Sequence, residues 1–169
     1  MSHGPQLLSA KEAFQSDAGI QVKSALPGWL SLRIAPEMHL RGKVVEFFRT
    51  QVDDLPSDLC EKLSLALDEL LGNALEHGCS NAPRPVEFAF LRTARMLLFH
   101  VKDAGCGFSL DDIPHAALNN PPENPYQHLE YRSQNGLRPG GFGIMMVQQI
   151  ADDLIYNEQG NEVVLIKYL

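Results

Sequence analysis

The amino-acid sequence predicts an α/β protein of 169 residues in which helices cover one face of one β-sheet, a two-layer sandwich. Two observations lead to this fold class. Apolar residues recur every three or four positions in three segments, as on the buried side of a helix. Short apolar and β-branched runs bounded by turn residues come before and after those segments. In order, we expect a strand, two helices, two strands, a long irregular segment, a helix and two strands.

The N-terminal part of the chain is polar and shows no sustained period of apolar residues. Several residues there interrupt regular structure. They are Gly4, Pro5, Gly19 and Pro27. We therefore expect residues 1–28 to form a loosely ordered extension, with room for a short helix near residues 7–14. Residues 29–169 are expected to form one folded domain.

A strand and two helices are expected next. Residues 29–34 carry the apolar and β-branched side chains of a strand, and residues 37–51 repeat apolar side chains at helical spacing. The clearest helix follows Pro56, where Asp58 and Glu61 fit a capping box and Gly78 is a natural stop. Its apolar stripe consists of Leu59, Leu63, Ala66, Leu67, Leu70 and Ala74.

The second half of the domain contains strands, a long irregular segment and one helix. The expected strands are residues 86–91, 96–102, 154–156 and 163–169, of which the last two form a hairpin. After Asp103 about 35 residues are rich in Pro, Asn and Gly. Because irregular segments of that length in compact domains are usually lids or disordered, we interpret residues 108–140 as a lid. Residues 141–153 have the apolar spacing of a helix.

Composition excludes several classes of protein. The net charge of −7, with only 14 Lys and Arg, gives no basic surface for nucleic acid or anionic lipid, although it tolerates a basic protein partner. Cys60, Cys79 and Cys106 have no CxxC spacing. No apolar run approaches the roughly 20 residues of a membrane span, and the N-terminus lacks the apolar core of a signal peptide. We expect a cytoplasmic protein that binds neither nucleic acid nor membrane.

The first candidate motif lies on the clearest helix. Glu69 and Asn73 are four residues apart, so they lie on the same face of that helix. An amide oxygen suits Mg²⁺, which prefers oxygen ligands together with phosphates and waters. A carboxylate one turn away could accept a proton from an attacking hydroxyl. The alternative interpretation is an exposed polar face of an amphipathic helix.

The second and third motifs are glycine-rich. Asp103, Gly105 and Gly107 follow a strand, where the glycines allow close backbone approach to a flat ligand and the carboxylate could accept from the amine of adenine. A plain glycine turn is the alternative. Gly141 and Gly143 open a helix, and the free N–H groups of a helix N-terminus attract phosphate. This segment has neither the lysine of a P-loop nor the position of a Rossmann turn.

Taken in order, the three motifs resemble the N box and two glycine boxes of the GHKL ATPases, the histidine-kinase, gyrase, Hsp90 and MutL type. Residues 69–78, the segment 140–144, Ala151-Asp152 and the terminal Lys167-Tyr168-Leu169 most resemble the bacterial anti-sigma-factor serine kinases. The resemblance covers about residues 29–169. It implies a Bergerat-type sandwich, with helices packed on one face of a mixed sheet.

The resemblance also implies roles for individual residues. Glu69 would be the general base, Asn73 the Mg²⁺ ligand and Asp103 the carboxylate that reads adenine. Residues 108–140 would be the ATP lid. The full set expected to bind ATP is Asn73, His77, Asp103, Gly105, Gly107, Arg138, Gly140, Gly141, Phe142 and Gly143. Arg132 and Arg138 are the cationic candidates for the γ-phosphate within the lid.

Three functions remain open at this stage. The first is an ATP- and Mg²⁺-dependent protein-serine kinase and anti-sigma factor. The resemblance implies that it phosphorylates an anti-anti-sigma protein of the STAS fold, sequesters a sigma factor and forms a homodimer. The second is a nucleotide-gated binding module without catalysis. The third is a histidine-kinase catalytic domain, but none of the six histidines lies in the phosphoacceptor pattern H-[ED]-x-x-[TN]-P.

Overall fold

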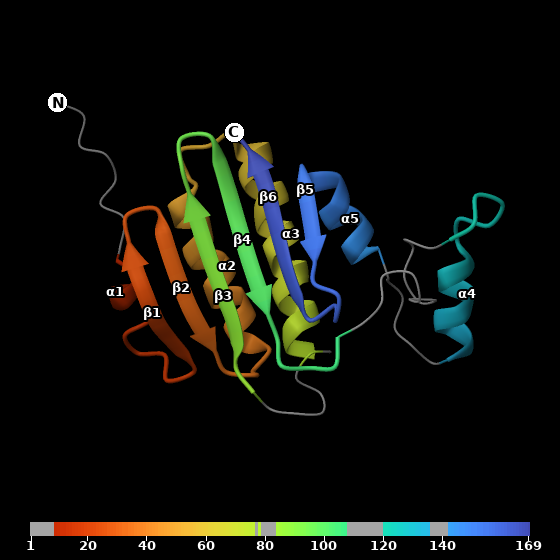
Figure 1. The fold of residues 1–169 in the computed structure, drawn as a ribbon, viewed down its shortest axis with the longest axis horizontal. Helices are drawn as coiled ribbons and strands as arrows, with labels where there is room; N and C mark the ends of the chain where they lie inside the picture. The colour runs from red at the N-terminus through yellow and green to blue at the C-terminus, as the bar shows by residue number, and fades with distance from the viewer. Residues whose placement is uncertain (1–8, 77, 79–83, 108–119, 136–141) are drawn as a thin grey trace.

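The computed structural model describes residues 9–76, 78, 84–107, 120–135 and 142–169, and these form a two-layer α/β sandwich (Figure 1). Its six-stranded sheet has the order β1-β2-β3-β4-β6-β5. The strands are β1 (Ile20–Leu26), β2 (Trp29–Ile34), β3 (Val86–Arg92), β4 (Met96–Lys102), β5 (Asp153–Tyr156) and β6 (Glu162–Tyr168). The helices are α1 (Ala10–Ala13), α2 (His39–Gln51), α3 (Ser57–Glu76), α4 (Gln127–Gln134) and α5 (Gly143–Ile150).

The core lies between the sheet and the helices α2, α3 and α5, which lie behind it in Figure 1. Alternate residues of β2, β3 and β4 point into this layer, so each strand buries one of its faces. Phe48 of α2 packs edge-on against Phe90 and Phe99, with ring centroids 5.3 and 5.0 Å apart. The predicted two-layer fold with helices on one face is confirmed.

The sheet differs from the mixed sheet that the resemblance implied, because all five strand pairings are antiparallel. Two helices separate β2 from β3, and they return the chain to the end of the sheet from which it left. β3 therefore runs antiparallel to β2. Between β4 and β5 the described chain has α4 and α5, and β5 runs in the same direction as β4 (Figure 1). β6 lies between these two strands and pairs antiparallel with both, so strands that run in the same direction are never neighbours in this sheet.

Helix α3 has the apolar stripe that its sequence predicted. Leu63, Ala66, Leu67, Leu70 and Ala74 are all buried, and Leu59 is partly buried against the core. The helix begins at Ser57, so Asp58 lies in its first turn instead of preceding it as a cap. An acidic residue in that turn still interacts favourably with the helix dipole.

The N-terminal region corrects a sequence expectation. Within the expected extension, residues 20–26 form the edge strand β1, which pairs with β2. The preceding α1 has a capping box between Ser9 and Glu12, and Phe14 packs against Phe47 of α2 with centroids 5.0 Å apart. A bulge between Val22 and Ser24 disrupts the alternation of side chains. Together with the exposure of an edge strand, the bulge explains why no strand period is visible in the sequence.

Candidate functional site

The candidate site begins on α3, where Glu69 and Asn73 are half-buried and one turn apart. Glu69 lies toward α5. Its carboxylate is so close to the backbone of Gly143 that a Cβ on that glycine would overlap Glu69 Oε2. Asn73 lies toward the end of β4, where it lines a small cavity together with Asp103. One helix face therefore reaches both the start of α5 and the end of β4.

The environment of Glu69 favours its protonated form. Burial raises the pKa of its carboxyl group, and the nearby charge of Asp68 raises the pKa further. Arg41 has the opposite effect, but its guanidinium is engaged by Asp68, with Nε and Oδ1 2.9 Å apart. A raised pKa brings a carboxylate closer to the pH at which a general base is most effective.

Asp103 is held at the end of β4 by backbone hydrogen bonds. Its N–H donates to the carbonyl of Asn161 (3.0 Å), and the N–H of Gly105 donates to Asp103 Oδ1 (2.7 Å). Burial raises the pKa of the carboxyl group, while the hydrogen bond from Gly105 lowers it. The second carboxylate oxygen has no hydrogen bond among the described residues, so it can accept from a ligand.

Glycines allow two backbone segments to pack closely around Asp103. A Cβ on Gly105 would lie 2.6 Å from the carbonyl oxygen of Gly78 and 2.9 Å from Asp103 Oδ1. A Cβ on Gly78 would overlap the Asp103 side chain. The sequence predicted Gly78 as the stop of a helix and as the end of the segment that carries the family resemblance. Neither prediction indicated its contact with Asp103. The structure thus adds Gly78 to the residues of this site.

The cavity between α3 and the sheet is small. Its volume is about 20 Å³, and its walls are formed by Leu70, Asn73, Ala74, Val101, Asp103, Tyr156, Gly160, Asn161, Glu162 and Val163. A cavity of this size has room for about one water molecule. An adenine ring would fit only after the walls separate. Burial raises the pKa of Tyr156 to about 12, so its phenol stays neutral at this wall.

The turn between β5 and β6 closes the cavity. Gly107 has a positive φ of 72°, and a Cβ there would overlap the backbone carbonyl of Gln159. The side chains of Gln159 and Asn161 both donate to the carbonyl of Gly105, at 3.2 and 3.3 Å. The sequence predicted this turn as a closing hairpin, but it did not indicate that the turn packs on the glycine loop.

The predicted residues at the start of α5 are Phe142 and Gly143. Phe142 occupies the N-cap position, and its ring packs edge-on against His128 of α4 with centroids 4.5 Å apart. Gly143 starts the helix beside Glu69. The structure therefore brings Glu69 and Gly143 together at one end, and Asn73, Asp103, Gly105 and Gly107 at the other. His77, Arg138, Gly140 and Gly141 lie outside the described residues.

The binding of a magnesium ion at this site would require the phosphates of a bound nucleotide as additional ligands. Among the described residues no group of three or more His, Cys, Asp and Glu side chains could hold a metal ion. The donor set near Asn73 is one amide oxygen, with the carboxylate of Glu69 one turn away. Mg²⁺ commonly takes few protein ligands and completes its octahedron with phosphates and waters, so this donor set fits Mg²⁺ bound to a nucleotide.

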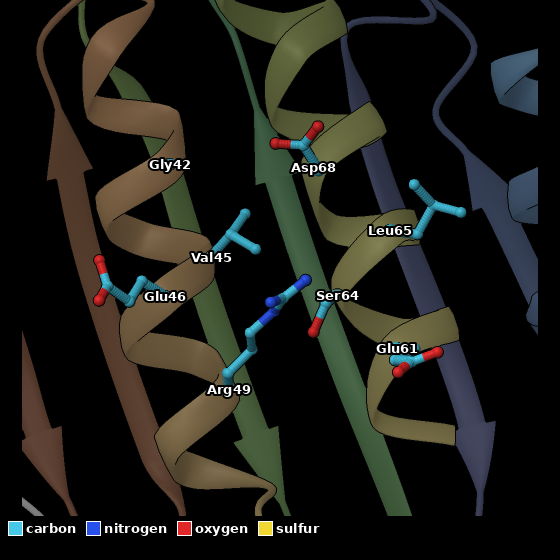
Figure 2. A pocket seen from close by; sticks show the side chains of 8 residues that line it. All are labelled: Gly42, Val45, Glu46, Arg49, Glu61, Ser64, Leu65 and Asp68. Carbon is cyan, nitrogen blue, oxygen red and sulfur yellow. The ribbon is translucent and has the colours of Figure 1, made fainter. Parts of the chain in front are cut away.

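A separate groove runs between α2 and α3 on the helix layer (Figure 2). It has a volume of about 770 Å³ and mixed charge. The residues that line it are Gly42, Val45, Glu46, Arg49, Glu61, Ser64, Leu65 and Asp68. Figure 2 shows the Arg49 side chain extending from α2 into the space between the helices. Because neither Asn73 nor Asp103 lines this groove, it is distinct from the cavity at the end of β4.

Comparison with protein families identifies the domain. The sequence profile of the family described as "Histidine kinase-like ATPase domain" matches residues 35–167. The chain belongs to this family. The match includes all the helices from α2 onward and the strands β3 to β6, and therefore the whole candidate site. The segment before it contains α1, β1 and β2, which extend this ATPase domain at one edge of its sheet.

A curated relative adds detail about this histidine kinase-like ATPase domain. The chain is 27% identical over 111 residues to the protein named "Serine-protein kinase RsbW" from Oceanobacillus iheyensis. The match spans 64% of this chain and 65% of the relative, so slightly less than two thirds of the relative is covered.

Within the described part of the chain, every helix falls short of the length or apolar character that crossing a membrane requires.

Proposed function

We propose that this protein is an ATP-dependent protein-serine kinase. The observation that carries the proposal is the position of Glu69. Its half-buried carboxylate, whose pKa is raised, lies one turn from Asn73 and directly beside the start of α5. A domain that only binds ATP needs no such carboxylate beside the metal ligand. The membership in an ATPase family and the relative named as a serine-protein kinase support the same function.

Adenine is assigned to the cavity at the end of β4. The Asp103 carboxylate accepts one backbone hydrogen bond from Gly105 and retains an oxygen for the exocyclic amine of adenine. Guanine has a carbonyl at that position and would oppose the carboxylate. Leu70, Ala74 and Val101 supply apolar walls for a flat ring. Entry of the ring requires the turn at residues 157–161 or the glycine loop to move, because the cavity holds about one water.

The phosphates are assigned to the start of α5. The first N–H groups of a helix have no partner within the helix, and the dipole favours an anion there. The carboxyl group of Glu69 lies next to Gly143. A phosphate at the same place repels Glu69 electrostatically and directs it toward the incoming hydroxyl. Asn73 would hold Mg²⁺, and the ion would neutralise phosphate charge.

In the proposed reaction Glu69 orients or deprotonates the hydroxyl of a substrate serine. The family resemblance suggests a serine on an anti-anti-sigma protein of the STAS fold as the acceptor. It also suggests that this chain sequesters a sigma factor and that it does so as a homodimer. The acidic net charge of −7 is compatible with basic surfaces on such partners.

The second candidate function is a nucleotide-gated binding module. Glu69 contacts Gly143, so its carboxylate has a packing role that would not require catalysis. Transfer of labelled γ-phosphate from ATP to a purified STAS protein distinguishes the two. The kinase proposal expects phosphoserine on the STAS protein in the presence of Mg²⁺ and ATP, and much less with GTP. ATP binding without transfer to any STAS protein encoded beside this chain would favour the binding module.

A further inference from the structure

Two residues beside the candidate site are poor choices for the helices that carry them. Gly72 lies in the interior of α3, where glycine makes a helix less stable than alanine would. Arg41 lies in the first turn of α2, where the helix dipole disfavours a positive charge. Residues that break a local rule in this way are commonly found at functional sites. The two residues therefore need an explanation other than the stability of their own helices.

Arg41 and Gly72 fit together across the two helices. A Cβ on Gly72 would lie 2.8 Å from Arg41 Nη1 and 3.7 Å from its Cδ, so the arginine side chain lies in the space that a side chain at residue 72 would fill. Arg41 Nε is also 2.9 Å from Oδ1 of Asp68, which lies one turn earlier on α3. Because Gly72 has no side chain, one arginine of α2 can span a full turn of α3.

The turn of α3 that Arg41 covers also carries the candidate site. Asp68 directly precedes Glu69 in the sequence, and Gly72 directly precedes Asn73. Figure 2 shows the Asp68 side chain on the side of α3 that faces α2. The Glu69 carboxyl group instead lies beside the start of α5. The ion pair with Arg41 therefore holds the charge of Asp68 on the α2 side of the helix, away from the start of α5.

Two charges act on the Glu69 carboxyl group in the described part of the chain. Its pKa is raised by burial and by the charge of Asp68, and it is lowered by the charge of Arg41. Helix α5, which packs against this carboxyl group, carries no ionisable side chain between Gly143 and Ile150. Because Arg41 neutralises Asp68 and also attracts a negative charge on Glu69, its loss would make Glu69 harder to ionise.

We propose that Arg41 is a positioning residue of the phosphotransfer site, which pairs with Asp68 across Gly72 so that Glu69 can carry its negative charge beside the start of α5. The inference rests on the proposed function, because it gives Glu69 the role of a base. Arg41 acts through Asp68 and through its own charge, without touching ATP or the acceptor serine. In its absence the uncompensated charge of Asp68 would favour the protonated form of Glu69, which cannot accept a proton from a hydroxyl.

The first test measures the ionisation of Glu69 without nucleotide or substrate. The pH midpoint of its titration is followed through the ¹³C chemical shift of its carboxyl carbon, assigned by comparison with Glu69→Gln. Arg41→Gln should move the midpoint to higher pH, and Asp68→Asn should move it to lower pH. The double variant loses one charge of each sign, so its midpoint should lie between those of the two single variants. Equal midpoints in the wild type and Arg41→Gln would overturn the proposal.

Gly72→Ala tests the geometry without changing any charge. The added Cβ would displace the end of the flexible Arg41 side chain, so the protein should still fold. The Glu69 midpoint should move in the same direction as in Arg41→Gln, by a smaller amount. The matched control is Arg49→Gln, which removes the same charge from the same helix at the far end of the groove from Asp68 (Figure 2). An unchanged midpoint in Gly72→Ala, or an equal shift in Arg49→Gln, would also overturn the proposal.

Phosphotransfer kinetics then connect the ion pair to the reaction. At a pH below the Glu69 midpoint, Arg41→Gln should lower kcat for transfer to a STAS protein roughly 3- to 10-fold and leave the KM for ATP unchanged. Raising the pH should restore most of the lost rate, which it would not do for a damaged fold. An unchanged kcat at every pH would overturn the positioning role. No transfer by the wild type, with the midpoint still shifted in Arg41→Gln, would refute the proposed kinase and support the ion pair's effect on Glu69.

Discussion

Replacing Gly107 by alanine tests whether the glycine loop and the β5–β6 turn close the cavity as described. Gly107 has φ 72°, a left-handed conformation that costs a residue with a Cβ about 1–2 kcal/mol. The added Cβ would also overlap the carbonyl of Gln159, which is backbone and cannot rotate away. Overpacking of this kind costs about 1–3 kcal/mol, and the reduced entropy of the unfolded chain offsets about 0.4–1 kcal/mol. We expect a net loss near 3 kcal/mol.

The matched control is Gly42→Ala on α2. A Cβ at Gly42 meets no atom within 4 Å, and the residue lies inside a helix. Alanine there should stabilise the protein by about 0.5–1 kcal/mol. For a chain of this size each kcal/mol shifts Tm by about 2–4 °C. Thermal unfolding should therefore show a fall of about 6–12 °C for Gly107→Ala and a small rise for Gly42→Ala. Equal Tm values for the two variants would refute the close packing of the loop on the turn.

Further predictions concern Asp103 and Gly143. Asp103→Asn should weaken ATP binding by about 1.5–3 kcal/mol and reduce the preference for ATP over GTP, measured by calorimetry. Because burial raises the pKa of Asp103, the charged carboxylate costs the folded state stability as pH rises from the ordinary Asp pKa through the raised one. Asp103→Asn without nucleotide should therefore be more stable than wild type at pH 7, and the advantage should vanish at acid pH. Equal stability at pH 7 would argue against the burial of that charge. Gly143→Ala should change Tm little, since the flexible end of Glu69 can move away, but should reduce phosphotransfer about 10-fold or more. Unchanged phosphotransfer by Gly143→Ala would show that the position of Glu69 beside the start of α5 does not matter for the reaction.

The sequence predicted the two-layer fold, helix α3 and the spacing of the site residues on that helix. Each of these features has a clear physical reason. The α3 stripe and the i, i+4 pair Glu69 and Asn73 depend on local helical geometry, which periodicity reports directly. The edge strand β1 was missed, because a bulge and exposure remove its alternation. The antiparallel pairing of all neighbouring strands depends on the number of helices that connect the strands and on the insertion of β6 between β4 and β5. Local sequence patterns encode neither of these features.

Within the site, the missed features are contacts between segments distant in sequence. Gly78 packs against Asp103, and the turn at Gln159 packs against Gly107. The residues in each contact are far apart in the sequence, so no short motif contains both of them. The small volume of the cavity likewise depends on how closely these segments approach each other. Glycine at such positions is visible in the sequence, but the atom that its missing Cβ would meet is not.

The most direct measurement compares Glu69→Ala and Asn73→Ala for both ATP affinity and phosphotransfer to a cognate STAS protein. If Glu69 acts on the serine hydroxyl, Glu69→Ala should reduce phosphotransfer by ~10²–10⁴-fold and leave Mg²⁺-dependent ATP affinity nearly unchanged. Asn73→Ala should lose ATP affinity and phosphotransfer together, because the amide is assigned to the metal. Full phosphotransfer by Glu69→Ala would contradict the kinase proposal at its central residue.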